Sequence, residues 1–510
     1  MWNERRLFAS VILTVTIGIA GGFLCYYAFQ TPLPQHGLLN EESFVALSFL
    51  GLLFVRSGKQ TSPAEGFAWM GVILIVPVVA LAFAPILRSP FLYDDYTHIT
   101  DASRFTWHVV AQQFEQVEGR GLFFRPVGFL LYWLNYLWAG ANPVWWHASG
   151  IALHAVCCCL VYALCLEIGL SRQASVIGAL MFALSGLAAE TVGWIDARFD
   201  LMTTILVLAS LLCVGRGWLV GGLAIGAAGM LCKESGFCLP LLIACLTLFR
   251  DRIERRRIWR AAALAGLIAL ALLAYRWWAL RGIGGYGAHF NILHTMDALL
   301  LRQWAVLFFP FNWSAPSSVV LRAALAATSL VLAASGWMAR APRRILAGCV
   351  MFILAAALPV QHLLLLGPAL SGSRQLYLGS VGWALLWAVV LDTIPWRRQI
   401  IVACAFLALA PCILEHNLKV WRDTAELARS VCAAFGKVAA DTQGAIVVRG
   451  LPVVRMGTVF LNNGFSQCVE MNSGVPAARI QVEGTGAAKS GTHEFVWNEA
   501  TERVEETAVR

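Results

Sequence analysis

Two adjacent aspartates, Asp94 and Asp95, are the leading candidates for chemistry in this sequence. They follow an apolar stretch at 67–87, which places them where the chain would leave a lipid bilayer. A carboxylate at such a position is partly desolvated, and desolvation raises its basicity, so it could accept a proton from a hydroxyl group. A solvated helix cap is the alternative interpretation. With His98, the pair is also a candidate ligand set for Mg²⁺ or Mn²⁺, although nothing else in the sequence identifies a cofactor.

Four later segments each combine a basic residue with acidic or aromatic neighbours. Basic residues are scarce in loops on the outer side of a membrane, so their recurrence at four helix ends needs a reason. One reason is pairing with neighbouring acids; the other is a ring of cations that binds a phosphate group. The candidate phosphate ligands are Arg125, Arg198, Lys233 and Arg374, and the supporting residues are Glu190, Asp200, Glu234 and Tyr377.

The composition indicates that membrane-spanning helices must position these groups. Of the 510 residues, 59% are hydrophobic and only 13% are charged, whereas about a quarter of the residues in a soluble domain are charged. The net charge of +9 does not indicate a nucleic-acid partner, because the basic residues cluster in short loops between apolar stretches. We therefore predict a multi-pass integral membrane protein surrounded by lipids.

Thirteen apolar stretches predict an all-α membrane domain with about 13 transmembrane helices. Residues 1–66 are expected to form an extra N-terminal transmembrane hairpin, whose first run is longer than the apolar part of a signal peptide and is retained. Residues 67–416 are expected to form the catalytic membrane domain. The predicted spans are 7–29, 44–55, 67–87, 144–166, 174–189, 201–215, 217–232, 236–249, 261–280, 317–338, 345–360, 375–393 and 399–416.

The distribution of basic residues predicts the orientation. Arg172, Arg216 and a cluster at 250–260 fall in loops that would be cytoplasmic, whereas residues 30–43 contain no Lys or Arg. The N-terminus is then inside, and thirteen spans place the C-terminus outside. Asp94 faces the periplasm or exterior under this topology, and the plasma membrane of a bacterium is the expected location.

Two outer regions complete the predicted organisation. Residues 88–143 form a first large outer loop with interfacial helices, because part of it is rich in aromatic side chains. The composition becomes ordinary after residue 417, and short apolar runs at 445–448, 458–461 and 495–497 predict strands. Residues 417–510 are therefore expected to be a small extracytoplasmic α/β domain, in which Cys432 and Cys468 could pair.

Taken in order, the motifs resemble the GT-C membrane glycosyltransferases, in particular the protein O-mannosyltransferases and the tetratricopeptide-linked O-mannosyltransferases. The likeness begins at the first outer loop and the helix after it, and it covers roughly residues 85–390. It is carried by Tyr93-Asp94-Asp95-Tyr96, Phe124-Arg125-Pro126-Val127, Leu134-Asn135-Tyr136, Asn142-Pro143, His147, Leu153-His154-Ala155, Glu190-Thr-Val, Arg198-Phe-Asp200, Lys233-Glu234 and Ser373-Arg374-Gln-Leu-Tyr-Leu.

The resemblance implies transfer of a sugar from a polyprenyl-phosphate donor to an acceptor hydroxyl, on a protein, glycan or lipid, by inverting displacement. Asp94 would correspond to the catalytic base, and Arg198, Lys233 and Arg374 would hold the donor phosphate. The chain departs from the family in three respects: two helices precede the usual first one, Gln375 stands where an aromatic residue is common, and the tail contains no 34-residue helical repeat.

Two other functions fit parts of the pattern. A transporter or channel would favour charged residues at mid-span, where a substrate is held halfway through the bilayer. A polysaccharide ligase or polymerase is the nearest enzymatic alternative. Because the notable charges gather at one face of the membrane, the sequence favours a one-sided enzyme, a hexosyl- or mannosyltransferase-like protein that uses a lipid-linked sugar.

Overall fold

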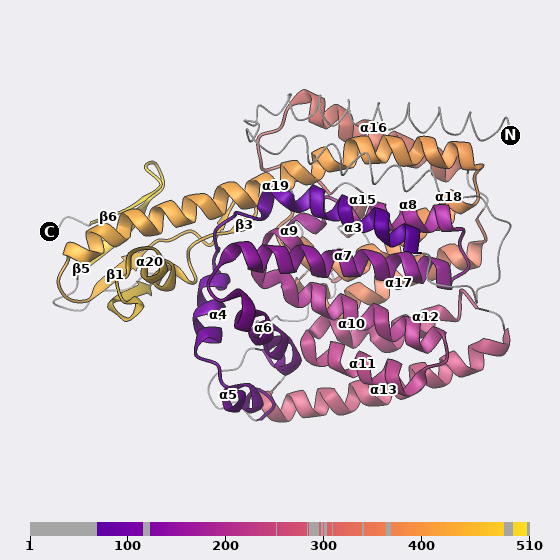
Figure 1. Ribbon diagram of the computed structural model, residues 1–510, viewed down its shortest axis with the longest axis horizontal. Helices are drawn as coiled ribbons and strands as arrows, with labels where there is room; N and C mark the ends of the chain where they lie inside the picture. Colours follow the sequence, from indigo (N-terminus) through magenta and orange to yellow (C-terminus); the bar gives the residue numbers. More distant parts are fainter. Residues whose placement is uncertain are drawn as a thin grey trace.

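The computed structural model shows a bundle of helices with a small sheet at one end (Figure 1). The predicted hairpin at 1–66 lies outside the residues that the structure describes. Those residues are 69–115, 123–250, 252–282, 284, 295–296, 299, 303–308, 310–338, 341–363, 369–483 and 493–506.

Apolar helices form the bundle, and most of them coincide with predicted spans. The α-helices are α3 (Trp69–Phe83), α7 (Pro143–Glu167), α8 (Arg172–Ala183), α9 (Ala188–Gly193), α10 (Arg198–Gly215), α11 (Leu219–Cys232), α12 (Leu239–Leu246), α13 (Arg252–Leu280), α15 (Gln303–Phe308), α16 (Val319–Met338), α17 (Arg343–Ala357), α18 (Tyr377–Asp392) and α19 (Trp396–Asp441). Short 3-10 helices are η1 (Ala84–Ile86), η2 (Ile195–Ala197), η3 (Glu234–Cys238), η5 (Leu358–Leu363) and η6 (Ser373–Leu376).

By length and composition, six helical segments in the described residues could cross a membrane, which confirms an integral membrane protein. They are Pro143–Glu167, Ile195–Gly215, Glu254–Leu280, Arg343–Gln361, Ser373–Asp392 and Trp396–Asp441, and four shorter apolar helices accompany them. The predicted total of thirteen spans is not confirmed. Two of the other predicted spans lie outside the described residues, and the one at 174–189 corresponds to α8, which has only 12 residues.

Small residues allow the helices to approach closely inside the bundle. Gly178 on α8 packs against α18, where an added Cβ atom would lie only 2.7 Å from the Cβ atom of Ala388. Close backbone approach of this kind is typical of helix packing in membranes, where lipid is as apolar as the helices themselves. Helices α8 and α18 are therefore packed in close contact inside the bundle.

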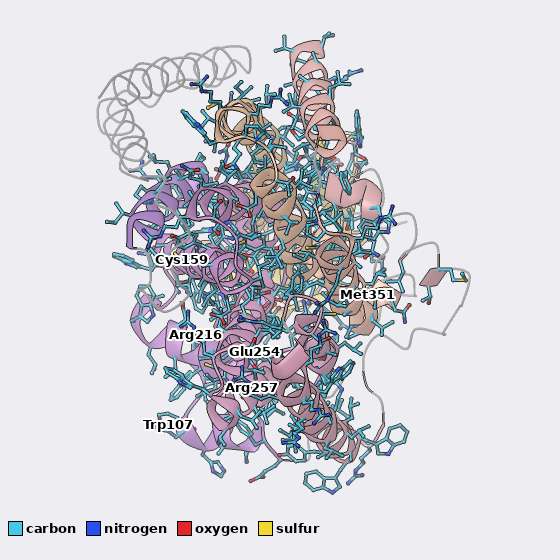
Figure 2. The ribbon with its side chains drawn as sticks, turned by 90° about the vertical axis from the view of Figure 1, so that its right-hand side faces the viewer. Trp107, Cys159, Arg216, Glu254, Arg257 and Met351 are labelled. Carbon is cyan, nitrogen blue, oxygen red and sulfur yellow. A yellow bond between two sulfur atoms is a disulfide. The ribbon has the colours of Figure 1, made fainter. Side chains whose placement is uncertain are left out.

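Helix α10 connects the two ends of the bundle. Its 18 residues span about 27 Å, close to the thickness of about 30 Å of a bilayer core. Beyond its C-terminal end, the side chain of Arg216 lies 3.2 Å from Glu167, and Arg257 donates a 2.7 Å hydrogen bond to the carbonyl of Gly215. Figure 2 looks onto this basic end, where Arg216, Glu254 and Arg257 are labelled.

The first outer loop lies at the opposite end and contains three helices, α4 (Asp94–Ser103), α5 (Trp107–Gln112) and α6 (Pro126–Ala139) (Figure 1). Several large apolar side chains near these helices are exposed, including Trp107, Leu137, Trp138 and Trp145. Exposed indole rings at the end of a membrane bundle are typical of the membrane–water interface. The placement is consistent with the interfacial helices that the sequence predicts.

The C-terminal region contains the predicted small sheet. Strands β1 (Ile446–Arg449), β4 (Ile480–Glu483) and β5 (His493–Asn498) are parallel, and β6 (Arg503–Glu506) pairs antiparallel with β5, in the order β4-β1-β5-β6. A second pair joins β2 (Val454–Arg455) to β3 (Thr458–Val459). Helix α20 (Phe465–Ser473) and the 3-10 helix η7 (Ala477–Arg479) complete this region, so β1, β3 and β5 fall where short strands are predicted.

Helix α19 joins the bundle to this sheet without a break (Figure 1). It has 46 residues, and the predicted domain boundary at 417 lies inside it. Its later part buries Phe435, whose ring contacts Phe465 of α20 and Phe495 of β5. A disulfide between Cys432 and Cys468, with 5.9 Å between the Cα atoms, links α19 to α20, so the two cysteines that the sequence left as a possible pair are joined.

Candidate active site

Asp94 and Asp95 form the first turn of α4, at the end of the bundle opposite the basic loops. The residue before them, Tyr93, has φ 57° and ψ −119°. A backbone with positive φ is uncommon for a residue with a side chain, costs on the order of 1–3 kcal/mol, and persists where the surroundings enforce it. Such strained residues cluster at functional sites, which makes this turn a candidate site on geometry alone.

The two carboxylates have different surroundings. Asp95 is buried, with 1% of its surface exposed, and its two oxygens accept hydrogen bonds of 2.9 Å from the backbone N–H groups of Leu92 and Asp196. Burial raises the pKa of its carboxyl, and so does the charge of Asp196. Both oxygens are thus used to join the start of α4 to η2, which favours a structural role over the predicted catalytic one.

Asp94, by contrast, is only partly buried and lies at the surface of the site. Its Oδ1 atom accepts a hydrogen bond from the side-chain amide of Asn463. Burial and the charge of Asp196 raise its pKa to about 6, although His98, Asn463 and Arg374 lower it. A carboxyl group with such a pKa is ionised at neutral pH and is a stronger base than an ordinary aspartate.

His98 pairs with Asp196 rather than with the two predicted acids. Its Nδ1 atom lies 2.5 Å from Oδ1 of Asp196, and its ring packs edge-on against Phe129 and Tyr132. Burial lowers the pKa of His98, but the carboxylates of Asp196 and Asp94 outweigh burial and raise it to about 9. Within the described residues no group of three or more His, Cys, Asp or Glu side chains is arranged to hold a metal ion, so the predicted ligand set with His98 is not assembled.

Arg374 lies beside this turn on η6 and pairs with Glu190 of α9. The Glu190 carboxylate also accepts hydrogen bonds from the Ser373 hydroxyl, at 2.9 Å, and from the Arg374 backbone N–H, at 3.1 Å. The guanidinium carbon of Arg374 lies 4.7 Å from the centre of the Trp194 ring, and that ring stacks on Trp421 of α19 at 6.0 Å. Glu190 is buried, whereas 21% of the Arg374 side chain is exposed.

Arg125 precedes α6 and forms a two-pronged contact with Glu234 of η3. Its Nε and Nη2 atoms donate hydrogen bonds of 2.9 and 2.6 Å to one carboxylate oxygen. The other oxygen lies 3.1 Å from Arg276 of α13, a cation that sequence analysis did not single out. The guanidinium of Arg125 also lies 4.3 Å from the centre of the Phe123 ring.

Lys233 and Asp200 form the most buried of these pairs. The Lys233 Nζ atom lies 2.5 Å from a carboxylate oxygen of Asp200, and each side chain is only 5% exposed. The charges of Arg125 and Arg374 act on Asp200 and also on Asp196. The three cations and the acids around Asp94 therefore belong to one electrostatic cluster.

Arg198 and Tyr377 differ from the other predicted site residues because both point into the protein. The Arg198 guanidinium donates to the carbonyls of Ile195 and Trp146, at 3.0 and 3.1 Å, and only 1% of the residue is exposed. The Tyr377 hydroxyl lies 2.6 Å from Nδ1 of His154 inside the bundle. These placements favour structural roles over contact with a substrate.

Besides Arg276, two residues near Asp94 were missed by the sequence analysis, for different reasons. Asp196 lies within the segment that contains Glu190 and Arg198, where its spacing makes it one of the neighbouring acids with which Arg198 could pair and gives no sign of His98 as a partner. Asn463 lies 369 positions from Asp94, and the only local signal is an Asn-Gly pair, which is typical of a turn.

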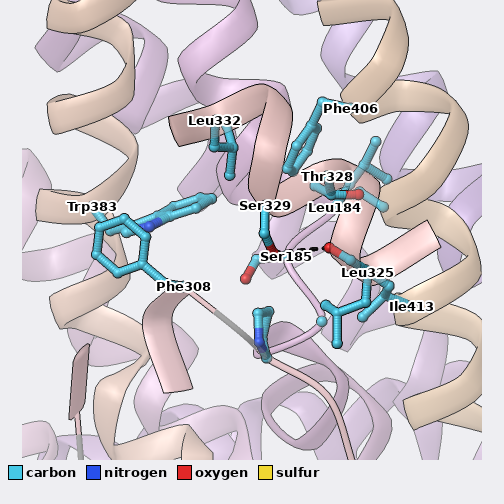
Figure 3. Close-up of a pocket in the computed structure, with 13 residues that line it drawn as sticks. Leu184, Ser185, Phe308, Leu325, Thr328, Ser329, Leu332, Trp383, Phe406 and Ile413 are labelled. Carbon is cyan, nitrogen blue, oxygen red and sulfur yellow. Dashed lines mark hydrogen bonds between the residues drawn. The ribbon is translucent and has the colours of Figure 1, made fainter. Parts of the chain in front are cut away.

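An apolar pocket lies inside the bundle near the site (Figure 3). Its polar side chains include Ser329, whose hydroxyl donates to the carbonyl of Leu325. A second, more polar pocket is lined by Glu190, Ser373 and Gly457, and Gly186 lines both pockets. The walls of the apolar pocket come from α16, α18, α19 and the segments around them, including Leu184, Phe308, Leu325, Leu332, Trp383, Phe406 and Ile413.

Comparison with known proteins supports the resemblance seen in the motifs. The chain is 27% identical over 184 residues to protein O-mannosyl-transferase TMTC3 of Mus musculus, which covers 32% of this chain and 20% of the relative. Over 212 residues it is 26% identical to TMTC1 of Homo sapiens, covering 36% and 23%. The alignment with TMTC4 of Homo sapiens is longer, 24% identical over 406 residues, and covers 62% of this chain and 54% of the relative.

The chain therefore spans between a fifth and about half of the length of these relatives. No protein-family model matches it, and no solved structure matches it. The motifs and the aligned sequences nevertheless agree on the same group of proteins. This chain is similar to the protein O-mannosyltransferase branch of the GT-C membrane glycosyltransferases.

Proposed function

We propose that this protein is a membrane glycosyltransferase that moves a sugar, mannose by analogy with its relatives, from a polyprenyl-phosphate donor to an acceptor hydroxyl. The observation that carries the proposal is Asp94, a partly exposed carboxylate with a pKa of about 6 on which the positive charges of Arg374 and His98 act. A general base of this kind suits attack by a hydroxyl, and the cations suit a phosphate leaving group.

The proposed reaction is an inverting displacement. The acceptor oxygen forms a bond to the anomeric carbon of the sugar while its proton passes to Asp94. The bond between that carbon and the phosphate oxygen breaks, and the electron pair leaves with the polyprenyl phosphate. Because the Asp94 carboxyl has a pKa of about 6, it is mostly ionised at neutral pH and can still accept the proton of the hydroxyl during attack.

Arg374 is the first candidate for the donor phosphate. Its guanidinium is partly exposed, and its charge acts on Asp94, so a phosphate bound there would lie close to the proposed base. Lys233 and Arg125 extend the positive charge behind it, each already paired with a carboxylate. Arg198 is left out of this group, because its guanidinium is directed at backbone carbonyls inside the protein.

The apolar pocket supplies a candidate place for the lipid of the donor. Most of its lining is hydrocarbon and aromatic, which suits a lipid, but the cavity is small, so the surrounding helices would have to separate before a polyprenyl chain could enter. Gly186 also lines the neighbouring pocket, which contains Glu190 and Ser373, and Glu190 contacts Arg374. A donor that extends from the apolar pocket past Gly186 toward Arg374 would have its lipid chain in the bundle and its phosphate near the cations.

We further propose that the site faces the outside of the plasma membrane of a bacterium, the periplasm in a cell with two membranes. The excess of basic residues lies at the opposite end of the bundle, as expected for the cytoplasmic side. The disulfide between Cys432 and Cys468 also suits an oxidising compartment. The acceptor is then an extracytoplasmic protein, as the names of the relatives suggest, or a glycan or lipid.

The proposal is tested with Asp94→Asn, which keeps the shape of the side chain but cannot accept a proton. Transfer of labelled mannose from polyprenyl-phosphate mannose is measured in membranes that contain the full chain, with glucose and galactose donors in parallel. We expect a decrease of about 10²–10⁴-fold in transfer, and for the unmodified protein a rate that rises with pH through about 6 as Asp94 loses its proton.

Asp101→Asn is the matched control, because Asp101 is an exposed aspartate on the same helix. Its transfer rate should stay close to that of the unmodified protein. Transfer by Asp94→Asn at the normal rate, with the protein correctly inserted, would falsify the assignment of the base.

A further inference from the structure

The C-terminal region touches the bundle next to the proposed base, in the turn between β3 and α20. Three residues of this tail make the contacts that matter. Asn463 donates its side-chain amide to Asp94, and Gly464 lies against the backbone of Tyr93. Further back, the carbonyl of Met456 accepts a 2.8 Å hydrogen bond from the side chain of Asn312.

The fit at Gly464 depends on the absence of a side chain. Gly464 has φ +73°, and an added Cβ atom would lie 2.2 Å from the carbonyl oxygen of Tyr93. That distance is far below any normal contact, so the turn can approach the start of α4 only with glycine at this position. Tyr93 is the residue with the unusual positive φ, so the tail packs directly against the strained backbone that presents Asp94.

The turn is also held from its other side. Helix α20 begins at Phe465, directly after the turn, and Cys468 within it is joined covalently to Cys432 of α19. Phe465 is fully buried against Phe435. The backbone N–H of Gly464 lies 3.1 Å from the side-chain oxygen of Asn463, so the Asn463 amide group is oriented with its N–H donors free to face the carboxylate.

Within the described residues, Asn463 provides the one hydrogen bond that the Asp94 side chain accepts, and it uses Oδ1. The other oxygen, Oδ2, remains open for an incoming hydroxyl. An amide donor on one carboxylate oxygen fixes the rotation of the group and stabilises its charged form. The groups that act on Asp94 from the bundle are His98 on the same helix, Asp196 on η2 and Arg374 on η6.

We propose that Asn463 is a positioning residue of the active site, and that Asn463 and Gly464 form one wall of it. The inference rests on the proposed role of Asp94 as base. It assigns to the C-terminal region a function in the reaction itself, because this region supplies the donor that orients the proposed base.

The experiment compares Asn463→Asp with Asn462→Asp in the full-length protein. Asn463→Asp keeps the oxygen that bonds to Gly464 and replaces the amide donor with a second carboxylate facing Asp94. Asn462→Asp adds the same charge one position away, on an exposed side chain. The rate of mannose transfer from polyprenyl-phosphate mannose is measured from pH 5 to pH 9.

For Asn463→Asp we expect the acid side of the profile to move about one pH unit or more above its normal midpoint, because a like charge disfavours ionisation of Asp94. Transfer at pH 6 should then be about fivefold lower or more, with a much smaller loss at pH 9. Asn463→Ala should move the midpoint in the same direction by a smaller amount and covers the case in which the aspartate variant fails to insert. Asn462→Asp should leave the midpoint nearly unchanged.

The inference is overturned by a normal pH midpoint in both Asn463 variants, or by an equal loss of rate at every pH, which is the signature of a purely structural contact. Asp94→Asn is measured beside them. If that variant retains transfer, the proposed function has failed; if it is inactive while both Asn463 variants have normal profiles, only the role of the tail is wrong.

Discussion

The most buried ion pair at the end of the bundle that carries Asp94, Lys233–Asp200, contrasts with the exposed pair Arg257–Glu254 at the opposite end. Lys233 and Asp200 are each 5% exposed, but Arg257 and Glu254 are 43% and 39% exposed. A buried ion pair is costly to break, because the remaining charge has lost both its partner and water, while an exposed pair contributes little. Similar residue types therefore have different consequences at the two ends.

The largest effect on stability is expected when one partner of the buried Lys233–Asp200 pair is removed. Lys233→Met leaves Asp200 buried without its cation, which should lower the free energy of unfolding by about 3–5 kcal/mol. The double variant Lys233→Met with Asp200→Leu removes both charges and should recover most of that stability without recovering transfer. Thermal unfolding of the detergent-purified variants checks the first part, and mannose transfer checks the second.

Two results would contradict this prediction. Normal stability of the Lys233→Met variant would show that leaving Asp200 without its cation does not destabilise the fold. Normal transfer by a stable double variant would show that Lys233 takes no part in binding the donor phosphate, and the pair would then be structural only.

An intermediate effect is expected at Arg374, which is paired but partly exposed. Arg374→Gln should reduce transfer roughly ten- to a hundredfold, the equivalent of about 1.5–3 kcal/mol for a hydrogen bond to a charged group. Because Arg374 lowers the pKa of Asp94, the variant should also move the acid side of the pH profile upward. Arg374→Lys keeps the charge and should retain more activity than the glutamine variant at every pH.

The smallest effect is expected at the opposite end. Arg216→Ala removes a side chain that is 49% exposed and 3.2 Å from Glu167, so the free energy of unfolding should change by less than about 1 kcal/mol. Transfer should stay normal. If Arg216→Ala lowered the stability as much as Lys233→Met, the difference in burial between the two pairs would not explain their energetics.

Local sequence signals were sufficient to predict a helical membrane protein and the small C-terminal sheet, and they identified Cys432 and Cys468 as residues that could pair without deciding whether they do. Long apolar runs identify helices that cross a bilayer, as at 144–166 and 345–360, and a charged pair after such a run must lie at a membrane surface. The end of the last span was harder to predict. Hydropathy falls after residue 416, but helix α19 continues to Asp441, because its later face packs against the small sheet instead of lipid.

The partners of the site residues could not be predicted from the sequence. His98 pairs with Asp196, at a separation of 98 positions, and Asn463 reaches Asp94 across 369 positions. Neither spacing has a periodicity that a local pattern could reveal. For the same reason, burial of Arg198 was unforeseen: an arginine at a helix end has the same local sequence whether it faces solvent or the backbone carbonyls of another helix.

Because α19 is continuous, its length determines how far the C-terminal sheet lies from the bundle and how the sheet is rotated about the helix axis. Its 46 residues extend for about 69 Å, of which a bilayer core takes about 30 Å. One residue inserted between Trp421 and Cys432 would turn the small sheet by about 100° and raise it by about 1.5 Å. The tail turn would then miss Asp94, although no residue of the site had changed. Insertions are therefore tolerable in the loops of the tail but not in this part of α19, whose length determines whether Asn463 reaches Asp94.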